Sequence, residues 1–261
     1  MKRILKTFVL IYILLHTSFF CLADGGVTEN ALLLKQAEQL LGNYKDSEAL
    51  LVYEQVLEKS TDNYVALCKA SYLHCRIGDR FSDETKKLEH FAKAREYASR
   101  AYNLDPADAE SNYVMALSIG CQSMVSGPKE RLAGVHEVKS FLDAALAADA
   151  QHSGAWHILG RWYFKMANLN FAEKAVSKLL FGGVCNVATN QDAAEAINKA
   201  ISLAPQNIRY YYDLALIYDE MKDKSSCIAT LEKTKTLVFE TKEELELSRR
   251  CKILLQKKIN S

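Results

Sequence analysis

Apolar residues recur every three or four positions along most of this chain, with polar residues between them, and this spacing predicts α-helices. The segment GAWHILGRWYF, residues 154–164, shows the pattern most clearly. Trp156, Leu159 and Tyr163 fall on one helical stripe, which we expect to pack between helices. Gly160 leaves room there for a neighbouring helix to approach closely. These aromatic residues are therefore interpreted as core rather than as a binding or catalytic cluster.

The spacing of these four residues is W-x2-L-G-x2-Y, the pattern of the first helix of a tetratricopeptide repeat. Further copies of this repeat have matching residues at the same four positions of the first helix. They also have a small, a bulky and a small residue at three positions of a second helix, and we call these positions slots. The last copy uses Tyr211, Leu214, Ala215, Tyr218, Cys227, Leu231 and Thr234. An earlier copy uses Leu67, Ala70, Ser71, His74, Ala94, Ala98, Ala101 and Pro106. Similar endings occur at Ala193, Ile197, Ala200 and Pro205, and Ala49, Tyr53 and Val56 mark a degenerate first unit.

The units are longer than the usual repeat of about 34 residues. They start near Tyr64, Ala109, Ser153 and Ile208, at spacings of 45, 44 and 55 residues. The excess lies between the two helices of each unit, so either the helices are long or extra turns are inserted. Residues 126–128, SGP, break one pair, and residues 168–181 predict an extra helix that ends at Gly182 and Gly183. Asn190 or Asp192 is expected to cap the helix that follows.

The C-terminal segment predicts a capping helix, which an open helical array requires. It begins with a capping box formed by Thr241 and Glu244, and its narrow apolar stripe runs through Leu245, Cys251, Leu254 and Leu255. No segment predicts a strand. The expected fold is all-α: a tetratricopeptide-like right-handed superhelix of antiparallel helix pairs, in one domain over residues 24–261.

Residues 157–183, HILGRWYFKMANLNFAEKAVSKLLFGG, and residues 193–205, AAEAINKAISLAP, resemble the regulator of microtubule dynamics family. The resemblance covers roughly residues 40–238 and is most specific at residues 160–162 and 180–182. It implies a divergent tetratricopeptide-like fold. For the eukaryotic family it also implies association with microtubules or organelle membranes, a role that fold alone does not transfer.

The first 23 residues predict an export signal. Lys2, Arg3 and Lys6 precede an apolar run of about 17 residues, and Ala23 fits the last position before cleavage. The alternative is an uncleaved signal anchor, because the run is nearly long enough to span a membrane. We therefore expect a periplasmic or envelope-associated protein that contacts a membrane only through such an anchor.

Charge and cysteine content narrow the function classes. Without residues 1–23 the chain has 30 basic and 32 acidic residues and no Lys/Arg cluster, so nucleic acid is not expected as a partner. Six cysteines remain, but Cys68 and Cys75 would lie about 10.5 Å apart on a helix, too far to bridge. We interpret the cysteines as small buried residues.

No nucleophile, metal or phosphate-binding motif is present, so we predict no enzyme, no catalytic residue, no metal and no cofactor. His152 and His157 are five residues apart, which misses the i,i+4 pairing of helical metal ligands.

The predicted binding site is the face lined by the first helices, which is concave in such arrays. Its aromatic and arginine content is typical of peptide-binding hot spots, and the alternative is a solvated face with incidental charges. The predicted groove residues are Tyr72, Arg76, His157, Arg161, Phe164, Lys165, Arg209, Tyr212 and Asp219, with Leu216 and Glu220 beside them.

Arg161 lies roughly 140° from Trp156 around the helix, which places it outside the core. Together with His157 and Lys165 it would favour an acidic or carboxylate-bearing partner. Alternatively, Arg161 is a buried structural arginine paired with a carboxylate across the long insertion.

The predicted function is a non-catalytic scaffold that binds a protein or peptide outside the cytoplasm. Two alternatives stay open: an accessory subunit of an envelope assembly or enzyme complex, and a hydrolase with an unrecognised site. The sequence predicts no oligomeric state.

Cleavage of the export signal is testable directly. We expect the mature chain to begin near Asp24, because the basic start, the apolar run and the small residue Ala23 together form a cleavable signal. N-terminal sequencing of the protein from its own cells measures this, and an intact Met1 on membrane-bound protein would identify a signal anchor instead.

Overall fold

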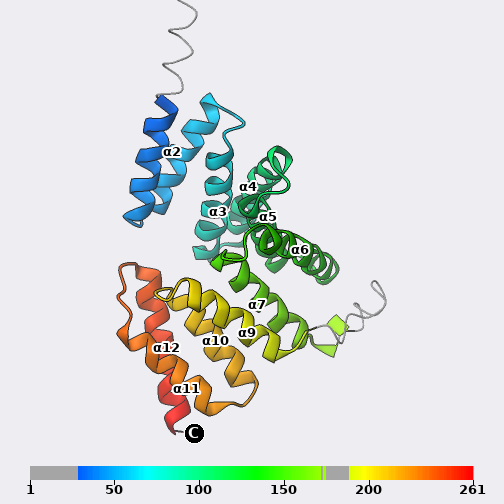
Figure 1. Ribbon diagram of the computed structural model, residues 1–261, viewed down its shortest axis with the longest axis vertical. Coiled ribbons are helices and arrows are strands. Elements are labelled where there is room, and N and C mark those ends of the chain that lie inside the picture. The colour runs from blue at the N-terminus through cyan, green and yellow to red at the C-terminus, as the bar shows by residue number, and fades with distance from the viewer. Residues whose placement is uncertain (1–28, 172, 175–187, 261) are drawn as a thin grey trace, which may run out of the picture. The chain divides into compact units, whose positions relative to one another are not determined.

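The computed structural model describes residues 29–171, 173–174 and 188–260. The chain divides into two compact units, Met1–Ala70 and Ser71–Ser261. The described part is helical, with no strand (Figure 1). The predicted signal peptide, Cys185 and most of the predicted extra helix lie outside the described residues. Among the helices that are described, none has the length and apolar content of a membrane span.

The first unit contains a helix over residues 29–42, α2 (Asp46–Lys59) and the beginning of α3 (Tyr64–Arg80). Tyr44, in the turn before α2, takes a left-handed conformation with φ of 59°. The Tyr53 hydroxyl donates to Glu38 Oε1 at 2.7 Å and joins α2 to the preceding helix. The predicted core residues Ala49, Tyr53 and Val56 are fully buried.

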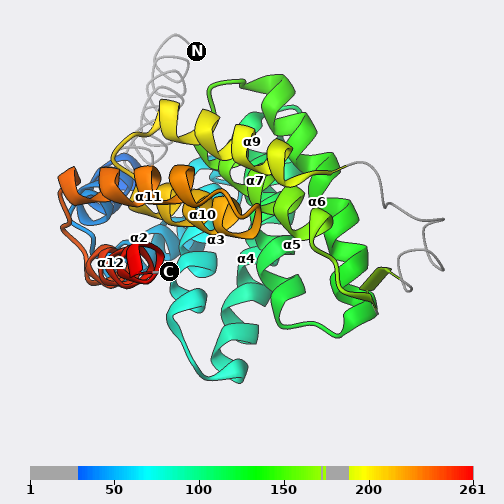
Figure 2. The same ribbon diagram turned by 90° about the horizontal axis from the view of Figure 1, so that it is seen from below.

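The second unit continues through the remaining helices, whose bounds follow. They are α4 (Glu84–Leu104), α5 (Ala109–Met124), α6 (Pro128–Ala148), α7 (Ser153–Ala167), α9 (Asn190–Leu203), α10 (Ile208–Glu220), α11 (Lys224–Lys233) and α12 (Lys242–Asn260). A short 3₁₀ turn, Thr234–Thr236, follows α11. Successive helices pack in pairs, as α5 with α6, α7 with α9 and α10 with α11 show (Figure 2). The predicted starts of the four units coincide with the first residues of α3, α5, α7 and α10.

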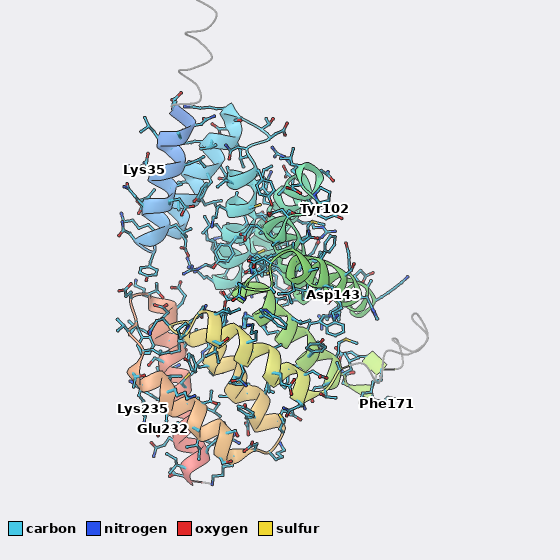
Figure 3. All side chains as sticks on the ribbon, in the orientation of Figure 1. Lys35, Tyr102, Asp143, Phe171, Glu232 and Lys235 are labelled. Atoms are coloured by element: carbon cyan, nitrogen blue, oxygen red, sulfur yellow. The ribbon has the colours of Figure 1, made fainter. Side chains whose placement is uncertain are left out.

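The extra length of the tetratricopeptide-like repeats has two different sources. The second helices α4 and α6 have 21 residues each, whereas α9 has 14 and α11 has 10. In the third repeat, which begins at Ser153, the extra residues lie between Ala167 and Asn190. An insertion, and not a longer helix, makes this repeat long. The longer α4 also reaches α6, where the Tyr102 ring labelled in Figure 3 packs edge-on against Phe141 at 5.3 Å.

The predicted small and bulky slots form the core. Ala94, Ala98 and Ala101 on α4 and Ala193, Ile197 and Ala200 on α9 are fully buried. On α7 the prediction needs adjusting: Leu159 is buried, but Trp156 and Tyr163 are only partly buried against the cluster of α9 and α10. The more buried indole is Trp162, 7 % exposed, whose Nε1 donates to the Val135 carbonyl oxygen at 2.6 Å.

The N-cap of α12 is formed by the predicted residues, whereas the N-cap of α9 is a different residue from those predicted. Thr189, not Asn190 or Asp192, is the N-cap of α9, and Asp192 completes a capping box by accepting from the Thr189 backbone. The predicted box before α12 is present: Glu244 N–H donates to Thr241 Oγ1 and Thr241 N–H donates to Glu244 Oε2, both at 3.1 Å. The Leu245 side chain was expected in the buried stripe of α12 but is 57 % exposed; Leu247, Cys251 and Leu255 form that stripe.

The described cysteines occupy buried positions, as predicted. Little or no surface is exposed on these residues, and none of them is in a disulfide: Cys68, Cys75, Cys121, Cys227 and Cys251. Burial, followed by a hydrogen bond to Cys121, raises the pKa of Cys75 well above its ordinary value. The Cys75 thiol is therefore protonated at neutral pH.

Gly160 sets how closely α7 and α9 approach. A Cβ placed there would lie 2.6 Å from Ile197 Cγ1, 2.7 Å from Ile197 Cδ1 and 3.0 Å from the Ala193 carbonyl oxygen. Real Cβ atoms do not come this close to a side chain, and the Ala193 backbone cannot rotate away. The glycine in the repeat pattern is therefore required by helix packing, as the sequence predicted.

Replacing Gly160 tests this close approach. We expect Gly160→Ala to lower the free energy of unfolding by about 1–3 kcal/mol, because the added methyl group overpacks the α7–α9 contact. The matched control is Gly120→Ala on α5, where a Cβ would meet nothing within 4 Å. That control should be neutral or stabilising by about 0.4–1 kcal/mol. Chemical denaturation measures both variants, and equal effects would contradict the packing role of Gly160.

Candidate functional site

A cavity of about 370 Å³ lies between α7 and α10. We call it the α7–α10 cavity; it is lined by Arg161, Phe164, Lys165, Asn168, Asp213, Leu216 and Ile217. Arg161, Phe164 and Lys165 were predicted as groove residues, and the structure brings them together. Their common place follows from spacing, since residues three or four apart share one face of a helix.

His157 was predicted on this surface, but it is buried and 5 % exposed. It lies one helical turn before Arg161, where α10 covers it. Its ring stacks on Tyr210 with centroids 4.5 Å apart, and its Nε2 lies 2.7 Å from Asp213 Oδ2. His157 is therefore a contact between the first helices of two successive units rather than a groove residue.

The electrostatics of this buried pair favour a neutral histidine and an ionised carboxylate. Burial lowers the pKa of His157 below its ordinary value, against the opposing effect of Asp213. For Asp213, burial alone would raise the pKa, but the hydrogen bond from His157 and the charges of Arg161 and Arg209 lower it overall. The imidazole thus donates Nε2–H to a carboxylate at neutral pH. The expectation of three cationic groups on this face is corrected to two, Arg161 and Lys165.

Arg161 is a surface residue of the cavity. Its side chain is 48 % exposed, and its Nε lies 4.0 Å from Asp213 Oδ2, beyond hydrogen-bonding distance. The alternative of a buried structural arginine is therefore wrong. Lys165 pairs with Glu173 at 2.6 Å, and its side chain is 43 % exposed. Burial opposes ionisation of Glu173, but the hydrogen bond from Lys165 leads the effects that lower its pKa.

On α10 only Leu216 of the predicted groove face lines the cavity. Tyr212 packs into the cluster formed with α12, and Asp219 pairs with Lys258 of α12. Instead, Asp213, Leu216 and Ile217 line the cavity, and Arg209 lies close enough to act on the Asp213 carboxylate. Tyr212 and Asp219 are therefore corrected from groove residues to contacts of the C-terminal helix. Leu216 was predicted beside the groove, whereas Asp213 was missed.

The two predicted groove residues of α3 lie outside this cavity. Tyr72 and Arg76 are half-buried. The phenols of Tyr72 and Tyr210 are near enough to Tyr113 to raise its pKa, although burial is the larger cause. Tyr72 therefore lies near Tyr113 of α5 rather than in the cavity.

A second histidine ties α7 to α5. His152 caps α7: its Nδ1 accepts from Ala155 N–H at 3.0 Å, so the ring proton is on Nε2, which lies 3.1 Å from Glu110 Oε2. The His152 ring lies 4.4 Å from that of Tyr113. Two histidines of this segment thus contact carboxylates of neighbouring helices: His152 contacts Glu110 of α5, and His157 contacts Asp213 of α10.

The described residues around the cavity form no metal-binding group. In the part of the chain that the structure describes, no group of three or more His, Cys, Asp or Glu side chains is placed to hold a metal ion. His157 and Asp213 serve a helix contact, and the other lining residues of the cavity are the cations Arg161 and Lys165, the amide Asn168 and three apolar side chains. Such a surface can hold an extended segment of another protein.

The family model described as "Regulator of microtubule dynamics protein 1-3" matches residues 33–260. The chain belongs to the regulator of microtubule dynamics family. Regulator of microtubule dynamics protein 2 of Macaca fascicularis is 26% identical over 174 residues, 65% of this chain and 42% of that protein. Regulator of microtubule dynamics protein 1 of Caenorhabditis elegans is 24% identical over 206 residues, 77% of this chain and 90% of that protein.

This regulator of microtubule dynamics family member spans about two fifths of the length of two mammalian relatives, protein 2 of Macaca fascicularis and protein 3 of Rattus norvegicus. Among solved structures, it is similar to a thermophilic tetratricopeptide-repeat protein of Thermus thermophilus, with a TM-score of 0.62 and 16% sequence identity. That match covers 87% of this chain and 99% of the other. The predicted all-α, tetratricopeptide-like fold is confirmed.

The buried pair between α7 and α10 predicts a pH-dependent stability. Because the pKa of folded His157 is lowered, the unfolded chain takes up a proton near its ordinary pKa of about 6.5 that the folded chain does not. The free energy of unfolding should therefore fall as pH drops from about 7.5 to about 5, by at most about 1.4 kcal/mol per pH unit from this group. The lowered pKa of Asp213 adds a further loss of stability in more acidic solution, below its ordinary value.

The His157→Asn variant should show a shallower slope over that range, measured by chemical denaturation at each pH. His136, whose pKa burial also lowers, should account for part of the remaining slope in a double variant with His136→Asn. Identical slopes in the wild type and His157→Asn would contradict the neutral, buried state of His157.

Proposed function

We propose that this protein is a non-catalytic scaffold that binds a protein or peptide in the α7–α10 cavity and acts outside the cytoplasm. The observation that carries the proposal is the cavity itself. Half-exposed cations lie at its opening beside the apolar side chains of Phe164, Leu216 and Ile217. Aromatic, apolar and arginine side chains around a concave site are what protein partners use as binding anchors.

The location outside the cytoplasm rests on the N-terminal sequence pattern alone. Microtubules are named for the relatives, and this chain matches only part of the mammalian ones, so we do not carry that partner over. A hydrolase is not proposed, because the buried His157 and Asp213 are committed to each other and to the contact of α7 with α10.

Capture of a partner from the native cells tests the function. The full-length chain with a C-terminal affinity tag should retain a defined protein from lysate of its own envelope fraction. The double variant Arg161→Ala with Lys165→Ala should lose most of it, more clearly at low salt, because screening weakens exposed charges at high salt. Quantitative mass spectrometry of the retained proteins measures the loss.

The matched control is Arg249→Ala with Lys252→Ala, which removes two exposed cations from α12. Thermal melting of the single Arg161→Ala variant comes first, and we expect a small shift because the side chain is half-exposed. Equal retention by the wild type and the cavity variant would contradict binding through the α7–α10 cavity.

A further inference from the structure

The α7–α10 cavity contains a cation whose donor groups are uncommitted. Arg161 lies 4.0 Å from the Asp213 carboxylate, and within the described residues it donates no hydrogen bond. A guanidinium has five N–H donors in a planar fork that matches a carboxylate. Its neighbours are already paired: Lys165 pairs with Glu173, and the Asn168 amide donates to the Phe164 carbonyl and to Asn190 Oδ1.

The carboxylate already in the cavity, that of Asp213, does not satisfy the N–H donors of Arg161. Asp213 is 17 % exposed, and its Oδ2 accepts the short hydrogen bond from His157. The charges of Arg161 and Arg209 both act on the Asp213 carboxylate, whereas Lys165 is paired with Glu173. Of the three charges Arg161, Arg209 and Asp213, one positive charge is in excess, and the half-exposed Arg161 guanidinium can take a further carboxylate.

The walls next to Arg161 are apolar. Phe164 lies three residues after Arg161 on α7, and Leu216 faces the cavity from α10. The exposed guanidinium thus borders a surface that gains free energy when an apolar side chain covers it. An occupant that satisfies both features has a carboxylate beside an apolar group.

We propose that the α7–α10 cavity takes an acidic, extended peptide segment, in which an Asp or Glu side chain binds Arg161 and an adjacent apolar side chain packs between Phe164 and Leu216. This inference rests on the proposed function and names the partner's chemistry. A single guanidinium can bind a side-chain carboxylate bidentately without a further donor, and the Asn168 amide is already paired.

Fluorescence anisotropy with capped peptides tests this chemistry. The probe is a fluorescein-labelled, C-terminally amidated peptide of three Glu-Leu-Glu-Phe repeats, titrated with the full-length protein purified from its own cells. The same peptide with Gln in place of Glu is the comparison. The acidic peptide should bind at least about tenfold more tightly, the smallest effect expected for a charge-assisted hydrogen bond.

Variants locate the binding. Arg161→Met should weaken binding of the acidic peptide by about tenfold or more, and Arg161→Lys should lose less, because it keeps the charge but not the fork. Leu216→Asn should weaken binding of both peptides. The matched control is Arg249→Met, which removes an exposed arginine from α12 and should leave binding unchanged. Thermal melting of each variant separates lost binding from lost folding.

Several results would overturn the inference. These are equal binding of the Glu and Gln peptides, no saturation by the acidic peptide up to about 1 mM, equal loss in Arg161→Met and Arg249→Met, or binding only of peptides with a free C-terminal carboxylate. If a cellular partner is captured through the cavity while the acidic peptide fails, the proposed function stands and this inference is wrong. If the acidic peptide binds through Arg161 while no cellular partner is captured, the chemistry inferred for the cavity stands and the proposed function is wrong.

Discussion

The hydrogen bond between His157 and Asp213 fixes the relation between the first helices of two successive units. It is short, buried and formed by one polar group from each helix, so α7 and α10 must meet in the register that brings them together. Removing one partner would leave the other without its hydrogen bond, which costs about 1–3 kcal/mol for a largely buried polar group. The bond also determines where the Asp213 charge lies, 4.0 Å from the Arg161 guanidinium beside the cavity.

The opposite side of α7 depends on a contact of a different kind. There Gly160 lets Ile197 and the Ala193 backbone of α9 approach to distances that any side chain would prevent. Helix α7 is thus held by close apolar packing towards α9 and by polar contacts towards α5 and α10. This division explains how the third unit keeps its pairing although residues 168–189 separate its two helices: the contact surfaces, and not the length of the connection, specify the pair.

The sequence predicted the packed parts of the fold well. The small-bulky-small slots on the second helices are buried where expected, and the four units start where their first helices begin. These features are local, because a stripe of alanines allows only one face of a helix to approach a neighbour. Residues with less local specification were misplaced: Trp156 is partly exposed, Leu245 is on the outer face of α12, and Trp162 supplies the more buried indole.

The candidate site was predicted only in part, because the sequence did not show which face of α10 the C-terminal helix α12 covers. A first helix has two polar flanks beside its core stripe, and spacing alone does not tell which flank faces a cavity. On α10 the flank of Tyr212 and Asp219 is covered by α12, which takes the place that a further unit would occupy. The other flank, with Asp213 and Leu216, therefore faces α7. Burial of His157 follows from the same placement, because Tyr210 and Asp213 of α10 enclose it. The C-terminal helix thus determines which residues of its neighbouring unit remain open to a partner.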